Sequence, residues 1–302
     1  MQEIKRLFWV FVYWFLGHFY PQGLITVIYW RCYGKGSEWK RNPQDIDQKI
    51  NWLKSYGDTS QWPLLADKYR VRQYVEERGL GDMLVPLLGR WERAGDVDWD
   101  SLPGQFVMKT NHGSGDALIC TDKTQLDTRY WTRYFEGLLH KRYGYFRAEP
   151  HYNLIPPCLI AEKLLDASRQ QVSSASLVDY KVWAFNGKPA YVWACYDRTK
   201  DSCKVGTYDL DWNFHPEYSV STSHYVLSDH PLPRPASLDR MLHAASVLSA
   251  GHPQARVDFY EVEDHPYFGE ITFTSASGFN SFYTPEFLNV LGQLCVLPSK
   301  KK

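Results

Sequence analysis

The sequence lacks the cysteine patterns that hold many small or secreted domains together. Its six cysteines include no CxxC pair and no Cys/His spacing typical of zinc, so we expect neither a zinc site nor a disulfide framework. We predict reduced and mostly buried thiols. Net charge is also absent, because 34 basic residues balance 34 acidic ones. This balance argues against a protein whose main role is to bind the backbone of nucleic acid.

Familiar catalytic and nucleotide-binding motifs are missing as well. The sequence contains no Walker A motif, no dinucleotide fingerprint and no evident Ser/His/Asp nucleophile. The chain has 302 residues, of which 44% are hydrophobic and 23% charged, enough for one large globular domain or two lobes. Any nucleotide site must therefore be built in another way.

The first 33 residues are apolar and aromatic but contain no run long enough to span a bilayer. LFWVFVYWFL (7–16) and LITVIYW (24–30) are separated by Gly17-His18 and a Pro-Gln-Gly break. Each run is shorter than the roughly 18–20 residues that a spanning helix needs. No small-residue cleavage site follows a short apolar core, so we do not expect a secretory signal.

Basic residues flank this N-terminal segment, namely Lys5, Arg6 and Arg31. Trp and Tyr favour the depth of the membrane interface, and basic flanks favour the anionic cytoplasmic leaflet. We therefore expect residues 1–33 to lie on the inner face of the cytoplasmic membrane, as a peripheral anchor of a cytoplasmic protein. A single signal-anchor span and a segment packed on the protein's own core are the alternatives.

Two amphipathic patterns follow a polar linker, and they predict helices at 45–57 and 67–79. The second helix would open with Asp67 as its cap and end at Gly79. Lys68 would then lie in its first turn, where backbone amides and the helix dipole favour a bound phosphate. A solvated lysine is the simpler alternative.

A glycine-rich loop between two predicted strands is a candidate for phosphate binding. It lies in QFVMKTNHGSGDALIC (105–120). Gly113 and Gly115 let the backbone approach a ligand closely, and Ser114 and adjacent amides can donate to phosphate oxygens. Lys109 adds a positive charge at the end of the first strand. An ordinary turn is the alternative.

The clearest hairpin is centred on Asn186-Gly187, a pair that favours a two-residue type I′ turn. It joins strand-like runs at 177–185 and 188–198. One face carries three charged residues, Asp179, Lys181 and Arg198. Beyond this hairpin we expect residues 199–235 to be irregular and residues 236–250 to form a helix.

A second hairpin, RVDFYEVEDHPYFGEITF, is the candidate metal site. With a tight turn centred on Asp264, Asp258 lies opposite Glu270, and Arg256 lies opposite Thr272. Facing carboxylates repel each other unless a cation lies between them. Oxygen ligands suit Mg²⁺, which usually keeps phosphate oxygens as further ligands. The alternative is a surface hairpin in which Arg256 pairs with either carboxylate.

Together these motifs resemble the TupA-like ATP-grasp family, which is named for teichuronopeptide synthesis. The matching segments between about Asp45 and Pro285 are QKINWLKSYGD, ADKYRVRQYV, FVMKTNHGSG, LIAEKLL, DYKVWAFNGKP and RVDFYEVEDHPYFGEITFTSASGF. Their order and spacing carry the specificity. The arrangement is also similar to that of the ribosomal-protein glutamate ligases, whose last motif ends Glu-x-Asn. Here Thr272 replaces that Asn, and a Thr hydroxyl is a poorer metal ligand.

The resemblance implies an α+β ATP-grasp fold, with two lobes whose antiparallel and mixed sheets clasp ATP, behind an N-terminal apolar helical segment. A helical part at 45–104 would carry the first nucleotide lysine, and 105–290 would form the ATP-grasp lobes. The residues implied to bind ATP are Lys68, Lys109, Gly113, Ser114, Gly115, Glu162, Leu164, Leu165 and Asp166. Those implied to bind Mg²⁺ are Asp258, Glu270 and Thr272. The catalytic cations near the γ-phosphate and the acyl-phosphate would be Lys181, Arg198 and Arg256.

The implied reaction is ATP-driven amide formation, in which a carboxylate takes the γ-phosphoryl group and an amine then attacks the acyl-phosphate. Cations and positioning supply most of the catalysis in such a transfer. The implied partners are ATP, a uronic acid of a cell-surface polysaccharide or its precursor, and an amino acid as the amine. The alternatives are a kinase-like ATP-grasp phosphotransferase, a glycosyltransferase-associated protein and a non-catalytic partner of a polysaccharide assembly complex.

Overall fold

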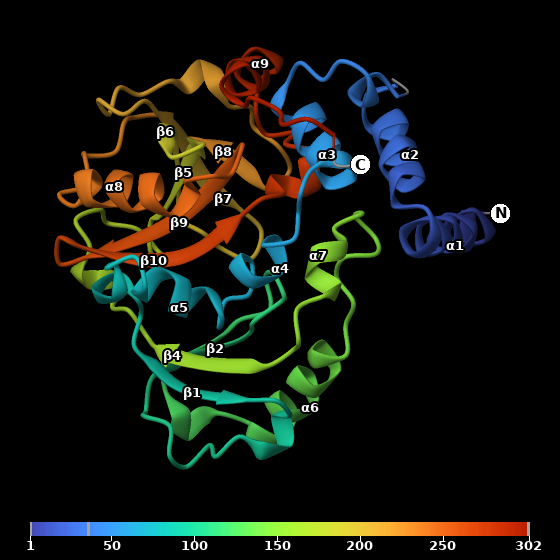
Figure 1. Ribbon diagram of the computed structural model, residues 1–302. Helices are drawn as coiled ribbons and strands as arrows, with labels where there is room; N and C mark the ends of the chain where they lie inside the picture. The colour runs from blue at the N-terminus through green and yellow to red at the C-terminus, as the bar shows by residue number, and fades with distance from the viewer. Residues whose placement is uncertain (1, 35–36, 301–302) are drawn as a thin grey trace.

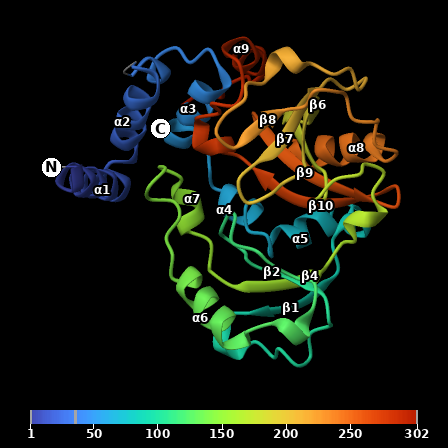
Figure 2. The same ribbon diagram turned by 180° about the vertical axis from the view of Figure 1, so that it is seen from behind.

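The computed structural model describes residues 2–34 and 37–300, which form two sheets in separate lobes and a helical hairpin at their side (Figures 1 and 2). The smaller sheet has four strands in the order β1-β4-β2-β3, and the larger has six in the order β10-β9-β5-β6-β7-β8. The strands pair antiparallel except β7 and β8, which are parallel. The predicted α+β arrangement of antiparallel and mixed sheets is confirmed.

The strands are β1 Leu87–Trp91, β2 Phe106–Thr110, β3 Leu118–Cys120, β4 Leu159–Lys163, β5 Asp179–Phe185, β6 Lys188–Tyr196, β7 Cys203–Tyr208, β8 Tyr225–Leu227, β9 Ala255–Val262 and β10 His265–Thr272. The α-helices are α1 Gln2–Phe19, α2 Pro21–Tyr33, α3 Ile46–Tyr56, α4 Trp62–Leu65, α5 Val71–Glu76, α6 Thr128–Leu139, α7 Pro150–Asn153, α8 Leu238–Ser249 and α9 Pro285–Leu294.

Alternation along β2 decides where Lys109 points. Phe106 and Met108 are fully buried and pack in one cluster with Phe135 of α6. Side chains alternate between the two faces of a strand. Lys109 therefore lies on the face of the smaller sheet that is turned away from α6.

The larger sheet has one apolar and one charged face. Val182, Val257 and Phe259 are fully buried in the core that includes α8. Lys181 lies opposite Asp258 in the register of β5 and β9, so both point to the other face. The apolar face of the C-terminal hairpin is thus part of the main core.

Both predicted hairpins form. The C-terminal hairpin has the predicted pairing of Asp258 with Glu270 but a different turn. Its turn consists of two residues in the left-handed region, Glu263 and Asp264, with φ of 54° and 58°, so it is not centred on Asp264 alone. This shifts the pairing near the turn by one residue. A β-bulge at Gly269 then restores the predicted pairing of Asp258 with Glu270.

The helix predicted at 67–79 was too long. Asp67 accepts hydrogen bonds from two backbone amides of the following turn, at 2.9 and 3.2 Å, and α5 begins only at Val71. Lys68 lies in this turn, and its amide donates to the backbone carbonyl of Asn111 at 3.0 Å. The predicted help from a helix N-terminus therefore does not apply to Lys68.

The region 199–235 is not irregular throughout, because it contributes β7 and β8 to the larger sheet. Val205 and Tyr208 of β7 are fully buried. The strand CKVGTY is buried over nearly its whole length, so it lacks the alternation of polar and apolar residues that marks a half-exposed strand. The helix predicted at 236–250 forms as α8.

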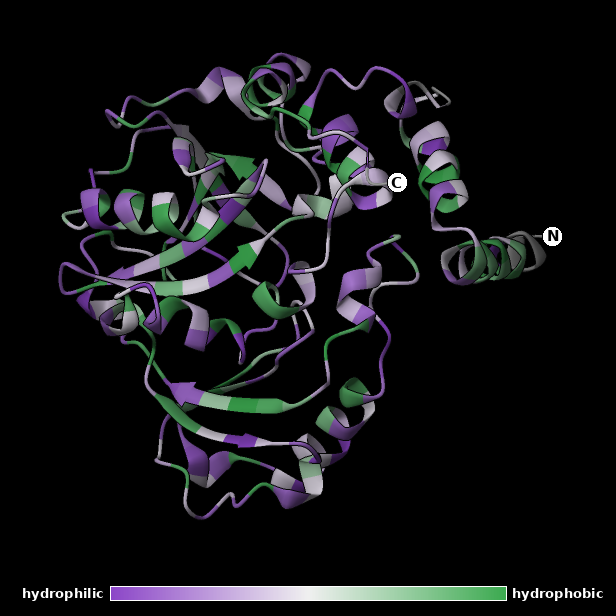
Figure 3. Cartoon of the chain, viewed as in Figure 1, coloured by the Kyte–Doolittle hydropathy of each residue, from purple (hydrophilic) through white to green (hydrophobic). Residues whose placement is uncertain are grey.

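The two N-terminal helices differ in their surroundings (Figure 3). Four residues of α2 are buried in a cluster with Trp39 and Phe279, namely Leu24, Ile25, Ile28 and Tyr29. α1 instead exposes large apolar side chains, including Leu7, Phe8, Val10, Phe11, Trp14, Phe15 and Phe19. Among the helices of the described residues, none combines the length and apolarity needed to cross a membrane.

All six cysteines are free thiols, and five of them are buried. This confirms the prediction of reduced and mostly buried thiols.

Candidate functional site

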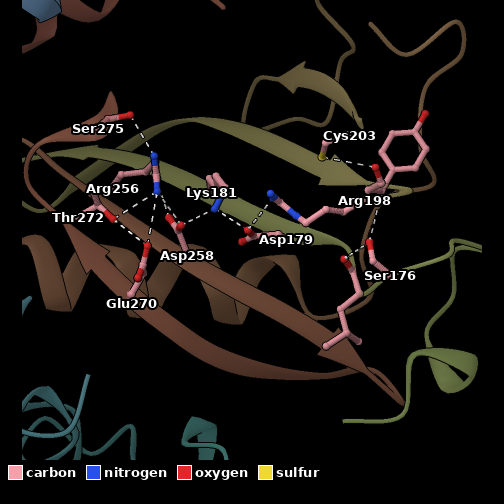
Figure 4. A network of polar contacts seen from close by, with 12 residues as sticks. Ser176, Asp179, Lys181, Arg198, Cys203, Arg256, Asp258, Glu270, Thr272 and Ser275 are labelled. Carbon is pink, nitrogen blue, oxygen red and sulfur yellow. Dashed lines mark hydrogen bonds and ion pairs between the residues drawn. The ribbon is translucent and has the colours of Figure 1, made fainter. Parts of the chain in front are cut away.

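A row of alternating charges crosses the charged face of the larger sheet (Figure 4). Lys181 Nζ lies 2.5 Å from Asp179 Oδ2 and 2.5 Å from Asp258 Oδ2. Arg256 binds Asp258 through two parallel contacts, Nε to Oδ1 and Nη2 to Oδ2, both at 2.8 Å. All four side chains are buried. Buried charges are tolerated when they are paired and hydrogen-bonded, as these are.

Two neighbouring carboxylates keep Lys181 protonated. Burial would lower the pKa of Lys181, but Asp179 and Asp258 raise it above its usual value. Asp179 behaves differently, because burial raises its pKa and Lys181 offsets this only in part. Lys181 is therefore a fixed cation, and the pKa of Asp179 lies above that of an ordinary aspartate.

Glu270 connects the charge row to Lys68. Glu270 Oε2 lies 3.2 Å from Lys68 Nζ, and the same ammonium donates to the backbone carbonyl of Gly113 at 2.8 Å. Burial would raise the pKa of Glu270, but Lys68, Lys181 and Arg256 outweigh it and lower the pKa to about 2. Glu270 is thus an anion at neutral pH, although its side chain is 35% exposed. The C-terminal hairpin, Lys68 and the glycine-rich loop meet at this point.

The glycine-rich loop is anchored at its base and open at its tip. Thr110 Oγ1 donates to Asp116 Oδ2 at 3.0 Å. A Cβ at Gly113 would lie 2.1 Å from that carboxylate oxygen, so no side chain fits there. Ser114 and Gly115 are exposed, and Gly115 has a φ of +73° with open space around it. The tip can therefore present backbone amides to a ligand.

Lys109 belongs to a second ion-pair group. Its Nζ lies 2.7 Å from Glu162 Oε2, and Glu162 Oε1 lies 3.1 Å from Arg72 Nη1. Glu162 thus balances two cations. Arg72 was not predicted, because nothing in the local sequence pattern distinguishes it from the other basic residues of this helical region.

The segment after β4 is the one that the resemblance assigns to adenine and ribose. Leu164 and Leu165 are half-buried and Asp166 is exposed. Asp166 Oδ1 accepts hydrogen bonds from the amide of Ser168 at 3.0 Å and from its hydroxyl at 2.7 Å. Its carboxylate therefore already stabilises a local turn.

The residues implied to bind Mg²⁺ come together, with cations beside them. Both oxygens of Asp258 are held by Lys181 and Arg256. The Thr272 hydroxyl donates to Glu270 Oε1 at 3.3 Å. Within residues 2–34 and 37–300, no group of three or more His, Cys, Asp or Glu is placed to hold a metal. Two facing carboxylates still fit Mg²⁺, which is often held by one or two carboxylates and by phosphate oxygens.

Arg198 lies at the end of the charge row farthest from Glu270 (Figure 4). Its Nη2 lies 3.6 Å from Asp179 Oδ2, and its side chain is 43% exposed. Asp179 separates Arg198 from Lys181. The three predicted catalytic cations therefore share one face but are spread along it.

A buried hydrogen-bond chain supports Arg256 from behind. Arg256 Nη1 donates to Ser275 Oγ at 3.0 Å, and that hydroxyl donates to Asn280 Oδ1 at 2.6 Å. Asn280 Nδ2 donates to Asp47 at 2.5 Å, and Asp47 also accepts from the Tyr33 hydroxyl at 3.0 Å. The chain thus runs from the charge row through α3 to α2. The sequence analysis missed it.

The loop after β10 has a strained backbone and is held in place by side chains of α3. Ala276 and Ser277 have φ of 45° and 59°, and such left-handed conformations cost about 1–3 kcal/mol each at non-glycine residues. Two side chains of α3 hold the loop. Asn51 Nδ2 donates to the carbonyl of Gly278 at 2.8 Å, and Lys54 Nζ donates to that of Ser277 at 2.9 Å.

Comparison with solved structures finds similar proteins at low identity. One is a D-alanine–D-alanine ligase from Bacillus anthracis, at 14% identity over 81% of this chain and 69% of that chain, with a TM-score of 0.40. Another is the ATP-grasp ligase PsnB complexed with minimal precursor, Mg and ADP, at 12% identity over 83% and 64%, with a TM-score of 0.38. A third is phosphoribosylglycinamide synthetase from Anaerococcus prevotii, at 11% identity over 83% and 55%, with a TM-score of 0.38. No curated protein matches the chain.

Comparison with protein families also gives a match over most of the chain. The model of the TupA-like ATP-grasp family matches residues 48–296. This span contains both sheets, the glycine-rich loop, the charge row and every residue that the sequence analysis placed in the site. The chain therefore belongs to the TupA-like ATP-grasp family and has the α+β fold expected of it.

Proposed function

We propose that the protein is an ATP-dependent carboxylate–amine ligase that works through an acyl-phosphate. The observation that carries this proposal is the joining of the charge row to the glycine-rich loop through Glu270 and Lys68. Fixed cations thereby lie beside the groups suited to bind phosphate. Phosphoryl transfer depends mainly on such positioned charge and needs little covalent help from the protein.

In this proposal the ATP phosphates lie between Lys68, Lys109 and the loop 113–115. The segment 162–166 holds adenine and ribose. Asp258 and Glu270 would hold Mg²⁺, which when bound neutralises charge on the phosphates. The engaged carboxylate of Asp166 makes it the weakest member of this set.

Lys181 and Arg256 act on the reacting groups. Lys181 is held between two carboxylates, and Arg256 is held by Asp258 and by the hydroxyl of Ser275. Cations fixed in this way need no reorganisation when an anionic carboxylate approaches an anionic γ-phosphate. Their role is to orient the acceptor carboxylate and to stabilise the charge on the transferred phosphoryl group. Arg198 adds positive charge at the open end of the row.

The acceptor and the amine that we propose are suggested by the family. Its name refers to teichuronopeptide synthesis, which favours a uronic acid of a cell-surface polysaccharide or precursor as the carboxylate and an amino acid as the amine. The charge row favours an anionic acceptor in the same way.

The location that we propose is the inner face of the cytoplasmic membrane, with α1 at the interface. Many apolar and aromatic side chains of α1 are exposed, including Leu7, Phe11 and Trp14, as are Arg6 and Arg31. Arg31 lies over the ring of Trp9, 4.4 Å from its centroid. A helix with aromatic and basic residues suits an interface rich in anionic lipids.

Hydroxylamine trapping tests the reaction. Purified protein with Mg·ATP, hydroxylamine and a panel of uronic acids should release ADP and form a hydroxamate without any natural amine. A phosphoester in place of the hydroxamate would instead make the protein a kinase-like phosphotransferase. Failure to bind Mg·ATP would support a non-catalytic partner.

A further inference from the structure

Asp179 is a buried carboxylate, and one of its oxygens has no hydrogen-bond partner among the described residues. Its contacts with Lys181, at 2.5 Å, and Arg198, at 3.6 Å, both involve Oδ2. Oδ1 is buried and accepts no hydrogen bond from the part of the chain that is described. The residue is 8% exposed. Leaving a buried polar atom unpaired costs about 1–3 kcal/mol, so such an atom needs an explanation.

The place of Asp179 suggests what the free oxygen is for. The row runs from Glu270 through Arg256, Asp258, Lys181 and Asp179 to Arg198 (Figure 4). With the phosphates at the Glu270 end, as proposed, Arg256 and then Lys181 come next, and these two cations meet the acceptor carboxylate. Asp179 lies one step further, where the second substrate must approach the activated carboxyl carbon.

Arg198 complements Asp179 in charge and in exposure. Its guanidinium has one ion-pair partner among the described residues, and its side chain is 43% exposed. Several of its N–H donors therefore remain for a ligand, and arginine binds carboxylates through paired donors. A buried anion and a half-exposed cation thus lie next to each other.

We propose that Asp179 and Arg198 form the amine subsite and that its ligand is an α-amino acid. The ammonium group binds Asp179 Oδ1, and the α-carboxylate binds Arg198. In an α-amino acid these two groups are separated by a single carbon, so a matching pair of side chains must be adjacent, as Asp179 and Arg198 are. This inference rests on the proposed ligase function and assigns Asp179 and Arg198 to the binding of its second substrate.

The chemistry balances with Asp179 as the first proton acceptor. The ammonium transfers one proton to Asp179, and the free amine then attacks the acyl carbon. The new C–N bond forms as the C–O bond to phosphate breaks, and the electron pair leaves with inorganic phosphate. The nitrogen loses a second proton to the departing phosphate and keeps the third. Burial, which raises the pKa of Asp179, makes it a better acceptor than an ordinary carboxylate.

A substrate pair tests the subsite. L-alanine and ethylamine differ by the α-carboxylate, and both are supplied with Mg·ATP and glucuronate or UDP-glucuronate. The wild type should use L-alanine at least 100-fold better in kcat/KM. Arg198→Ala should raise the KM for L-alanine and bring this preference to within about threefold of one.

Asp179→Asn separates the two halves of the reaction. It should lower amide formation at least 100-fold, while hydroxamate formation, which uses an amine that is neutral at pH 7, falls much less. Asp197→Asn is the matched control, because Asp197 is also ion-paired, to Lys204 at 3.0 Å, but lies outside the charge row.

The outcomes separate this inference from the proposed function. Absence of hydroxamate from the wild type would overturn the ligase proposal and the subsite with it. Hydroxamate with equal use of L-alanine and ethylamine would overturn the subsite alone. The subsite is also overturned if Arg198→Ala lowers both amines equally, or if Asp179→Asn lowers hydroxamate and amide equally.

Discussion

The two groups of cations in this protein are held in different ways. On the larger sheet, Lys181 and Arg256 are buried and each contacts a buried carboxylate at 2.5 or 2.8 Å. In the smaller lobe and the turn before α5, Lys109 and Lys68 are partly exposed, and among the described residues each pairs with one carboxylate. Loss of the partner of a deeply buried charge costs much folding free energy. Water can replace the lost partner of a partly exposed charge.

The difference suggests that the two groups of cations have different roles. Breaking any ion pair in the buried row of the larger sheet costs much free energy. The row therefore keeps its geometry before any substrate binds. A partly exposed lysine can exchange its carboxylate for a phosphate at little cost. We therefore expect substitutions on the larger sheet to affect both stability and turnover, and substitutions of Lys68 or Lys109 to affect nucleotide binding far more than stability.

Asp258→Asn should have the largest effect. It removes the anion shared by Lys181 and Arg256, and removing one partner of a buried pair costs about 3–5 kcal/mol. ATP turnover should fall more than 100-fold, since Asp258 is also a proposed Mg²⁺ ligand. Urea unfolding and ADP release measure the two effects. Asp264→Asn, in the exposed turn of the same hairpin, is the control. Turnover within about tenfold of wild type, roughly 1.4 kcal/mol of barrier, would exclude Asp258 as a principal ligand.

Removal of the N-terminal helices should separate membrane binding from folding. A protein lacking residues 1–19 should lose association with anionic vesicles and keep its stability, because α1 is largely exposed. A protein lacking residues 1–33 should also lose several kcal/mol, since the buried side chains of α2 are worth about 1.5–3 kcal/mol each. Vesicle cosedimentation and thermal melting distinguish the two. If the full-length protein stays in the supernatant at low salt, the interfacial role of α1 is wrong.

Lys109→Ala should weaken Mg·ATP binding about tenfold or more and change the free energy of unfolding by less than about 1 kcal/mol. The reason is that Glu162 keeps Arg72 as its partner, at 3.1 Å. The thermal shift caused by millimolar Mg·ATP measures the binding. Lys188→Ala, an exposed residue beside the Asn186-Gly187 turn, should leave this shift unchanged. An equal loss of shift in both variants would contradict the assignment of Lys109.

The smallest expected effect is the pH dependence of the Lys68–Glu270 pair. The pKa of Glu270 lies below its usual value of 4.5, at about 2. The pair therefore stabilises the folded protein fully above about pH 4.5, and this contribution is lost as the pH falls toward 2. Lys68→Ala should lower stability slightly at pH 7, with a difference from wild type that shrinks below pH 4.5. A difference that is constant from pH 7 to pH 2.5 would show that the pair contributes nothing.

Local patterns predicted the two hairpins and the charged face. The pairing of Asp258 with Glu270 was predicted correctly although the turn was not, because the two-residue turn and the bulge at Gly269 displace the register in opposite directions. Strand alternation is a strong signal when one face is buried. The length of the helix after Asp67 was wrong, because capping residues can close a turn without starting a helix.

Partners far apart in sequence could not be predicted. Arg72 and Glu162 are 90 positions apart, and Asp47 and Asn280 are 233 apart. No local pattern indicates which acid will balance which base across such distances. The only local hint of the buried chain was a polar Asp47 next to the apolar Ile46 in an amphipathic helix.

The hydrogen-bond chain from Tyr33 to Arg256 joins residues that are synthesised at very different times. α1 carries the exposed apolar surface and leaves the ribosome long before Asn280, which connects Asp47 to Ser275. Domains form progressively during synthesis. The surface proposed to meet the membrane is thus available long before the support of Arg256 can form. In the interfacial role proposed for α1, the nascent chain meets the membrane before the support of Arg256 exists, and that support forms when the segment around Asn280 closes onto α3.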